Sequence, residues 1–391
     1  MLTRSGDVAP PAGLSELHGT ALRAQLRPGS FPQGVCSGVA AVGLMRILLI
    51  VDPEHPVPPR QYGGTERVAD LLAREWSRCG HRVDLLAGQG SRAYGGSLHL
   101  HKPPSKAYLS RVRRKLQFQL QSLWAARHCD VVCNFGRFDY LEALLRLGKP
   151  ILHTFHHPID QVLVDAVEAR VRSGSVLFHC ISAHQRSQAS FRHPSIVVPN
   201  PIEVLRYRPG AGEAGHLAFL GRLSRNKGVD VAIAAARRVG QPLLLAGPVP
   251  NEPGARDFFQ AEVQPALDAG VARWLGPLDD EGKQELLAGA SALLFPIRWD
   301  EPFGLVMTEA LACGTPVVAT RRASTPEVIR DGITGWLCDP AEPDPDAFAA
   351  AIRRVPQLDR HQCRLDVERR FGVEAIAAQL LDALESLPAT N

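Results

Sequence analysis

Residues 300–319 read DEPFGLVMTEALACGTPVVA, and this stretch decides the fold. Ahead of it, Ala290–Phe295 is short and apolar, which predicts a buried strand. Residues 304–313 have the pattern of a helix that Gly314 would end, and apolar residues then return as the next strand. A strand, a helix and a further strand in this order indicate a parallel α/β sheet.

The same stretch carries two carboxylates, with Glu301 just before the predicted helix and Glu309 inside it. The first amides of a helix have no acceptor within the helix, so those near Phe303, Gly304 and Leu305 are free to bind an anion. We therefore expect an anion site with one carboxylate at its mouth and the other about one turn further in.

Composition indicates a soluble globular protein with two sizeable domains, because the 391 residues are 45% hydrophobic and 21% charged. A net charge of +4 is too small to argue for nucleic acid, although it suits acidic small molecules such as nucleotides. The eight cysteines are scattered, which favours a reducing cytoplasm. Cys129 and Cys133 lack a second pair of ligands, so no metal site is predicted.

Residues 1–44 are rich in Pro, Gly, Ser and Ala and show no sustained period, which predicts a disordered extension. Their apolar run is too weak and too interrupted for a signal peptide. The sequence also has no uninterrupted apolar run long enough to span a bilayer. Whether the extension belongs to the native protein is left open.

A glycine loop follows the first predicted strand, 46–51, and Gly63-Gly64-Thr65-Glu66 leads from it into a helix. Glycines let a backbone approach a phosphate or sugar closely, although a loop that merely needs positive φ is the alternative. Residues 88–93 match a dinucleotide fingerprint, but the residues after them cannot form the helix that this site requires.

Four further strands are predicted at 130–133, 150–154, 176–181 and 196–198. His156 follows the second of them, and open α/β sheets bind ligands at the carboxyl ends of their strands. A histidine there can act at a site, and a purely structural role is the equal alternative.

Residues 106–128 predict a helix that has basic residues and no acidic one. Its basic residues are Lys106, Arg111, Arg113, Arg114, Lys115 and Arg127, and its apolar stripe is Leu109, Val112, Leu116, Leu120, Leu123 and Trp124. The simpler interpretation turns the stripe to the core and the basic face to solvent. The alternative is a contact with anionic lipid at a membrane surface.

A second alternating series begins after Pro199-Asn200-Pro201, so we expect domains over 45–205 and 206–391, with the last helix packing back on the first domain. Arg222 and Lys227 follow the strand that begins at His216, beside Gly221. They form a second expected anion site, with a solvated basic loop as the alternative. Asp346, in an Asp-Pro-Asp triplet that resembles a metal-binding acid pair, is predicted to be an N-cap instead.

Taken together, these residues resemble the retaining glycosyltransferases of the GT-B fold, family four. The matching pieces are Gly63-Gly64-Thr65-Glu66, Pro199-Asn200, Gly221-Arg222-Leu223, Lys227-Gly228, Ala246-Gly247-Pro248, Gly276, the stretch from Glu301 to Glu309, Pro326-Glu327-Val328-Ile329 and Asp331-Gly332-Ile333-Thr334-Gly335. The resemblance implies an α/β fold with two Rossmann-like, doubly wound parallel-sheet domains that face a cleft. It assigns the acceptor to the first domain and the nucleotide sugar to the second.

The resemblance also implies roles. Arg222 and Lys227 would hold the donor diphosphate, Glu309 the ribose and Glu301 the transferred sugar. The remaining site residues are His156 at the edge of the sugar, and Gly63, Gly64, Phe303, Gly304 and Leu305 around the sugar and phosphates.

The implied reaction moves a hexose from a UDP- or GDP-linked donor to an unknown acceptor hydroxyl, with retention and with neither a metal nor a cofactor. A nucleotide-sugar epimerase or hydrolase, or a non-catalytic binder, stays open as the alternative. The expected location is the cytoplasm, with a peripheral contact at the inner membrane face through residues 106–128. His157, Pro201 and Ala323 depart from the residues usual in the family, and the first two put sugar and acceptor preference in doubt.

Overall fold

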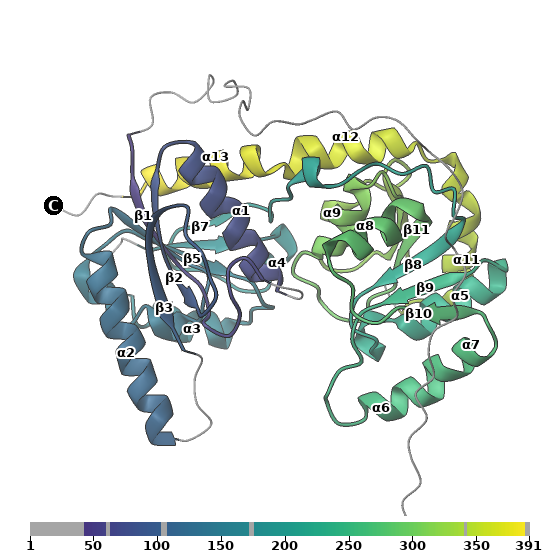
Figure 1. Cartoon of the computed structure of the whole chain (residues 1–391), viewed down its shortest axis with the longest axis horizontal. Coiled ribbons are helices and arrows are strands. Elements are labelled where there is room, and N and C mark those ends of the chain that lie inside the picture. Colours follow the sequence, from purple (N-terminus) through teal and green to yellow (C-terminus); the bar gives the residue numbers. More distant parts are fainter. Residues whose placement is uncertain (1–42, 60–62, 103–107, 172–175, 340–341, 388–391) are drawn as a thin grey trace, which may run out of the picture. The chain divides into compact units, whose positions relative to one another are not determined.

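The structure is a computed structural model that describes residues 43–59, 63–102, 108–171, 176–339 and 342–387 (Figure 1). Apart from its last two residues, the extension predicted over 1–44 lies outside these ranges. The described residues form one compact unit.

Within the described residues, the first sheet has seven parallel strands in the order β3-β2-β1-β4-β5-β6-β7. Its strands are β1 (Arg46–Ile50), β2 (Arg82–Gly88), β3 (Gly95–His101), β4 (Val131–Asn134), β5 (Ile151–Phe155), β6 (Val176–Cys180) and β7 (Ser195–Val197). The helices between them are α1 (Gly64–Arg78), α2 (Tyr108–Ala126), α3 (Gln161–Glu168) and α4 (Ala183–Ser187). Most central positions of these strands are buried, as expected for a parallel sheet covered on both faces.

The second sheet, again among the described residues, has six parallel strands in the order β10-β9-β8-β11-β12-β13. Its strands are β8 (His216–Leu220), β9 (Leu243–Ala246), β10 (Ala272–Trp274), β11 (Ala290–Phe295), β12 (Val317–Thr320) and β13 (Gly335–Cys338). The helices are α5 (Val229–Val239), α6 (Ala255–Phe258), α7 (Gln264–Asp268), α8 (Asp280–Gly289), α9 (Leu305–Ala312), α10 (Thr325–Val328), α11 (Pro345–Arg354), α12 (Arg360–Phe371) and α13 (Val373–Glu385). The two α/β domains, each built on a parallel sheet, confirm the predicted fold class.

The last helix, α13, packs with the first sheet and not with the second. Its residues Ile376, Leu380 and Leu384 belong to the hydrophobic cluster that contains Ile47 of β1 and Trp76 of α1. The indole of Trp76 also donates a hydrogen bond of 3.2 Å to the carbonyl of Ala377. Figure 1 shows α12 and α13 running in succession from the second sheet to the first.

The prediction that the apolar stripe of residues 106–128 faces the core is wrong for most of its described residues. Helix α2 packs with Phe118, Ser122, Ala125 and Ala126, which are buried. The exposed members of the stripe are Val112, Leu116, Leu120 and Trp124. The small side chains of Ala125 and Ala126 let the opposite face of the helix approach the sheet closely. A periodic apolar stripe shows that a helix has two faces, but it does not show which of them packs on the sheet.

The N-cap predicted at Asp346 is also wrong. Asp344 caps α11, because its carboxylate accepts hydrogen bonds from the amides of Asp346 and Ala347 at 3.1 and 3.2 Å. Pro345 then occupies the first helical position, where proline is favoured. Asp346 instead forms an ion pair with Arg238 of α5.

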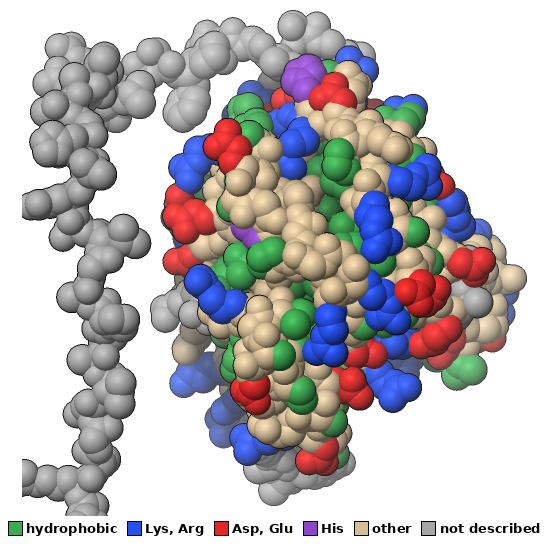
Figure 2. Space-filling model, turned by 90° about the vertical axis from the view of Figure 1, so that its right-hand side faces the viewer, with side chains coloured by type: hydrophobic (Ala, Val, Ile, Leu, Met, Phe, Trp, Pro, Cys, Tyr) green, Lys and Arg blue, Asp and Glu red, His purple; other side chains and the backbone are tan. Residues whose placement is uncertain are grey.

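Charge is mixed on the face seen from the right-hand side of Figure 1. Figure 2 shows Lys and Arg side chains alternating with Asp and Glu there, without a large patch of one sign. Among the described residues, none of the helices combines the length and the apolar character that crossing a bilayer requires.

Candidate active site

Lys227 lies where the chain leaves β8 and turns into α5. A short 3-10 turn, Arg225–Lys227, ends at Gly228, whose φ of 76° lies in the left-handed region. A Cβ on Gly228 would overlap the carbonyl oxygen of Pro296, which follows β11. Glycine is therefore needed here for both its backbone angle and its close approach, and it brings Lys227 against the segment after β11.

That segment presents Glu301 to Lys227. The Lys227 ammonium forms an ion pair with Oε2 of Glu301, and the indole Nε1 of Trp299 donates to the same oxygen at 3.1 Å. The ammonium also lies 4.6 Å from the centroid of the Trp299 ring. The two charged side chains are only 16% and 14% exposed, so their mutual attraction is screened less than that of a surface pair.

Helix α9 begins at Leu305, shortly after Glu301, and the amides at its start are free. Gly304, at φ 83°, precedes its first residue, and the amides of Phe303, Gly304, Leu305 and Val306 donate to no protein acceptor within the described ranges. These groups and the helix dipole favour an anion beside Lys227. The structure thus brings together a set of free donors next to the segment that carries Glu301, and the binding of an anion there stays a prediction.

Ser324 holds this connection in place, and sequence reasoning missed it. Its buried hydroxyl lies 2.9 Å from the carbonyl oxygens of both Glu301 and Phe303, which share its single proton. The Phe303 side chain is buried against Phe371, with ring centroids 5.7 Å apart. Because Ser324 lies 21 residues beyond Phe303 in the sequence, no local pattern signals the contact.

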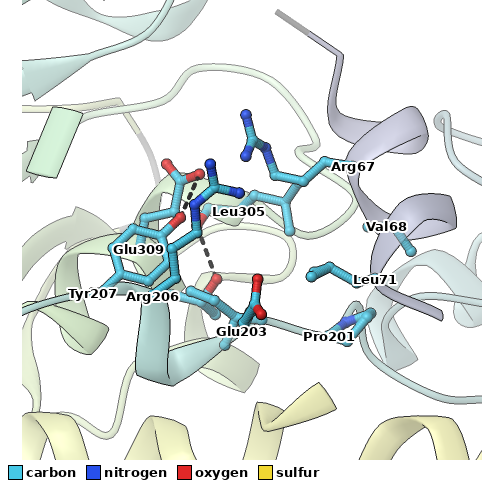
Figure 3. Close-up of a pocket in the computed structure, with 11 residues that line it drawn as sticks. Arg67, Val68, Leu71, Pro201, Glu203, Arg206, Tyr207, Leu305 and Glu309 are labelled. Atoms are coloured by element: carbon cyan, nitrogen blue, oxygen red, sulfur yellow. Dashed lines mark hydrogen bonds between the residues drawn. The ribbon is translucent and has the colours of Figure 1, made fainter. Parts of the chain in front are cut away.

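Glu309 lies about one turn into α9 and is buried. The phenol of Tyr207 donates to its Oε1 at 3.2 Å. Both line a small pocket of about 20 Å³ whose other wall includes Arg67 and Val68 of α1. Figure 3 shows these residues around the pocket, with Leu305 among them. The pocket has room for about one water molecule.

Arg222 follows the same strand as Lys227, but its side chain contacts Glu252 and not Glu301. Its guanidinium donates to Oε1 of Glu252 at 2.9 Å, and the Arg222 side chain is 33% exposed and that of Glu252 68%. Gly247, at φ 135°, approaches the carbonyl of Gly221 so closely that a Cβ would overlap it. The backbone at this strand end is therefore fixed, whereas the long side chain of Arg222 is held only by an exposed pair.

Gly63 and Gly64 bring the start of α1 to the start of α9. Gly63 has a φ of 154°, and a Cβ there would lie 2.8 Å from Oε2 of Glu66. A Cβ on Gly64 would lie 3.3 Å from Cδ1 of Leu305. Gly63 therefore has the positive φ that the simpler interpretation expected, and Gly64 packs against Leu305, whereas contact of this loop with a phosphate or sugar stays a prediction.

His156 follows β5, as expected from the sequence. Its partly buried ring meets the edge of Phe135, with centroids 4.9 Å apart. The buried Nε2 has no hydrogen-bond partner among the described residues. Burial, helped by nearby histidines, holds the pKa of His156 well below its usual value, so the imidazole is neutral at physiological pH.

Three polar contacts join helices of the first sheet to residues further along the chain, two of them in helices of the second sheet and one, Glu203, in the segment between the two sheets. Arg67 of α1 donates to both carboxylate oxygens of Asp280 in α8, at 3.2 and 2.8 Å. Arg74 of α1 does the same with Glu203, at 3.0 and 2.8 Å. The carboxylate of Glu327 accepts from the first amides of α4 at 2.6 and 2.7 Å. These contacts place α1 beside α9 and thereby set the distance between the glycine loop and Glu309.

Two family models match the chain one after the other. The model described as Glycosyltransferase Family 4 matches residues 62–206, and the model described as Glycosyl transferases group 1 matches residues 210–368. The second match contains Lys227, Glu301 and Glu309.

The curated relatives match over only part of this chain and part of their own length. A glycogen synthase of Mycobacterium tuberculosis is 35% identical over 207 residues, which are 49% of this chain and 48% of the relative. A D-inositol 3-phosphate glycosyltransferase of Geodermatophilus obscurus is 33% identical over 191 residues, which are 41% of this chain and 40% of the relative. The chain thus spans about half the length, or less, of these two relatives.

Among solved structures, HepE of Anabaena in complex with UDP and glucose matches with a TM-score of 0.69 at 18% identity. The match covers 88% of this chain and 100% of that one. At this identity the likeness shows the fold alone, which is the GT-B fold of two facing α/β domains. With both family models in sequence and this fold, the chain belongs to the family-four glycosyltransferases of the GT-B fold.

Proposed function

We propose that this chain is a glycosyltransferase that moves a hexose from a nucleotide-diphosphate sugar, UDP- or GDP-linked, to an acceptor hydroxyl. The observation that carries the proposal is the contact of Lys227, Glu301 and Trp299 beside the free amides of α9. A cation, helix N-terminal donors and a carboxylate within one site suit a ligand with phosphates at one end and sugar hydroxyls at the other.

In this proposal the charge on the leaving diphosphate is stabilised by the ammonium of Lys227 and the amides near Gly304. Such preorganised donors act on charge that develops in the transition state. When the donor binds, Lys227 exchanges part of its contact with Glu301 for a phosphate oxygen. Glu301 then accepts hydrogen bonds from the hydroxyls of the transferred sugar, and Arg222 turns from Glu252 towards the phosphates.

Glu309 is proposed to hold the ribose hydroxyls, with Tyr207 fixing one of its oxygens. The neutral imidazole of His156 is proposed to contact the edge of the sugar, where an uncharged ring can accept or donate one hydrogen bond. The departing phosphate takes the proton of the acceptor on the same face, which gives retention and needs no protein base. Because Arg222, Lys227 and the first amides of α9 stabilise the negative charge of the diphosphate, the reaction needs no divalent metal.

Nucleotide release from a panel of UDP-, GDP- and ADP-sugars tests the proposal with the full chain. A true donor also raises the melting temperature by mass action, because it binds only the folded state. We expect Lys227→Ala and Glu301→Ala each to lower kcat by about 10²–10³-fold, the usual effect of losing one such group. Arg238→Ala, which removes a well exposed ion pair with Asp346, is the control that keeps the wild-type rate.

Wild-type rates in either site variant would refute the assignment. Nuclear magnetic resonance of the product reports the anomer, and inversion would refute retention. Activity lost in chelator and restored by manganese would refute metal independence. Recovery of an epimerised donor, or nucleotide release that no acceptor accelerates, would favour the epimerase or hydrolase alternative.

A further inference from the structure

Helix α2 exposes a continuous apolar face on the side opposite to its packing. The exposed fractions of its four large apolar side chains are 52% for Val112, 56% for Leu116, 56% for Leu120 and 55% for Trp124. Because these residues recur every fourth position, they lie on one side of the helix. Figure 1 shows α2 at the outer flank of the first sheet, where its N-terminal end projects beyond the neighbouring elements.

Positive charge lies within this same face. Arg113 and Arg127 are exposed, with Arg113 in the helix between Val112 and Leu116 and Arg127 directly after its last residue, Ala126. Lys115 is less available, because it pairs with Asp139 at 3.5 Å and Glu142 at 3.9 Å. Residues 106–128 contain no Asp or Glu, so no acidic side chain of the helix opposes the two arginines.

We propose that this face, defined by Val112, Arg113, Leu116, Leu120, Trp124 and Arg127 and called the α2 face, docks on an anionic lipid surface. The apolar side chains enter the boundary between headgroups and acyl chains, and the arginines meet lipid phosphates. Trp124 suits that boundary because its indole has an apolar body and a polar N–H. The arginine stems can lie along apolar surface while their charged ends stay at the headgroups.

Charge argues against a second copy of this chain as the occupant. A symmetric dimer through the α2 face would bring the Arg113 and Arg127 side chains of two copies into one interface. Like charges at such an interface oppose association unless acidic groups intervene, and the helix has none. A lipid surface with negative headgroups supplies the missing opposite charge. This inference is independent of the chemistry proposed at Lys227.

Vesicle flotation with the full chain tests the proposal. The probes are vesicles of phosphatidylcholine alone and of equimolar phosphatidylcholine and phosphatidylglycerol, at low salt and in about 1 M salt, where the Debye length is about 3 Å. We expect the wild type to float with the anionic vesicles at low salt, to bind the neutral ones at least about ten-fold less, and to lose most of its binding in salt.

Two variants and one control separate the sources of binding. Leu116→Glu with Leu120→Glu should lower binding to anionic vesicles by about ten-fold or more, because two apolar side chains no longer insert. Arg113→Glu with Arg127→Glu should lower it similarly through charge. Val162→Glu with Leu163→Glu, at apolar residues of α3 that are 78% and 41% exposed, places the same charge away from the α2 face and should bind like the wild type. Circular dichroism confirms that each variant is folded.

Absence of wild-type binding at low salt would overturn the proposal, and so would a Leu116→Glu, Leu120→Glu variant that binds as well as the wild type. Sedimentation measures the oligomeric state and so tests the other possible occupant of the α2 face, a second copy of this chain. A wild-type dimer that this double variant dissociates, together with no vesicle binding, would show that a second copy covers the α2 face and would overturn the lipid assignment.

Discussion

Ala323 has a φ of 53°, and among the described residues it alone is a non-glycine residue with positive φ. It immediately precedes Ser324, whose hydroxyl holds Glu301 and Phe303 in place. An alanine in the left-handed region costs about 1–2 kcal/mol, because its Cβ crowds the following carbonyl. This strain lies in the segment that supports the proposed donor site.

Replacing Ala323 with glycine should raise the free energy of unfolding by about 0.5–1 kcal/mol. The relief of the left-handed strain exceeds the extra freedom that glycine gives the unfolded chain. Urea unfolding measures the change. Ala350→Gly is the matched control, since Ala350 is exposed within α11, and there the same substitution should cost about 1 kcal/mol. Destabilisation by both substitutions would contradict the strain argument.

At the scale of elements, β5 and β6 each carry a buried histidine, and the two lie on opposite faces of the first sheet, because His153 pairs with Phe178 and His179 with Thr154. His153 contacts the Asn134 amide at 3.0 Å, and His179 contacts Thr154 and the Val198 carbonyl at 2.9 and 2.7 Å. Burial lowers the pKa of His153 to about 3 and that of His179 to about 4. Both side chains therefore stay neutral in the folded protein over the ordinary range of pH.

These strands make stability depend on pH. Below a pH of about 6.5 the unfolded chain protonates both histidines and the folded chain does not, so the free energy of unfolding falls as the pH falls. Each of His153 and His179 contributes up to about 1.4 kcal/mol per pH unit between pH 6.5 and about pH 4.5. Urea unfolding at successive pH values measures the slope. A flat profile over that window would contradict the buried neutral state.

At the scale of the molecule, the contacts of α1 with the residues of the second sheet determine what surrounds Glu309. Arg67 is the central residue, because it lines the pocket beside Glu309 and also binds Asp280 with both of its terminal nitrogens. Asp280 in turn receives Arg206 and Lys283. Any movement that admits a nucleotide at Glu309 therefore involves this cluster of charges.

A double-mutant cycle with Arg67→Ala and Asp280→Ala should give a coupling energy of about 1 kcal/mol in unfolding. The pair is bidentate and partly buried, with side chains 15% and 38% exposed, which places it at the upper end of the range for exposed pairs. The exposed pair of Arg321 and Asp331 serves as the control and should couple weakly. Equal coupling in the two cycles would remove the special role given to Arg67.

The sequence by itself determined the family and the fold class, and it placed most strands within one or two residues. Ala290–Phe295, Gly304 and Gly314 illustrate why, since a buried strand and the limits of a helix depend on local periodicity and on backbone angles that glycine allows. Such features depend only on residues that are close together in the sequence. The order of the motifs then identified the family.

Only the tertiary structure decided which groups meet. Lys227 and Glu301 are 74 residues apart, and the hydroxyl of Ser324 reaches back across more than twenty residues to the same loop. The face of α2 that packs on the sheet could likewise not be read from the sequence. Leu116 and Ala126 are both apolar, and their spacing does not show which of them is buried. The physical reason is common to these cases: long-range packing selects one arrangement among several that local preferences leave equally acceptable.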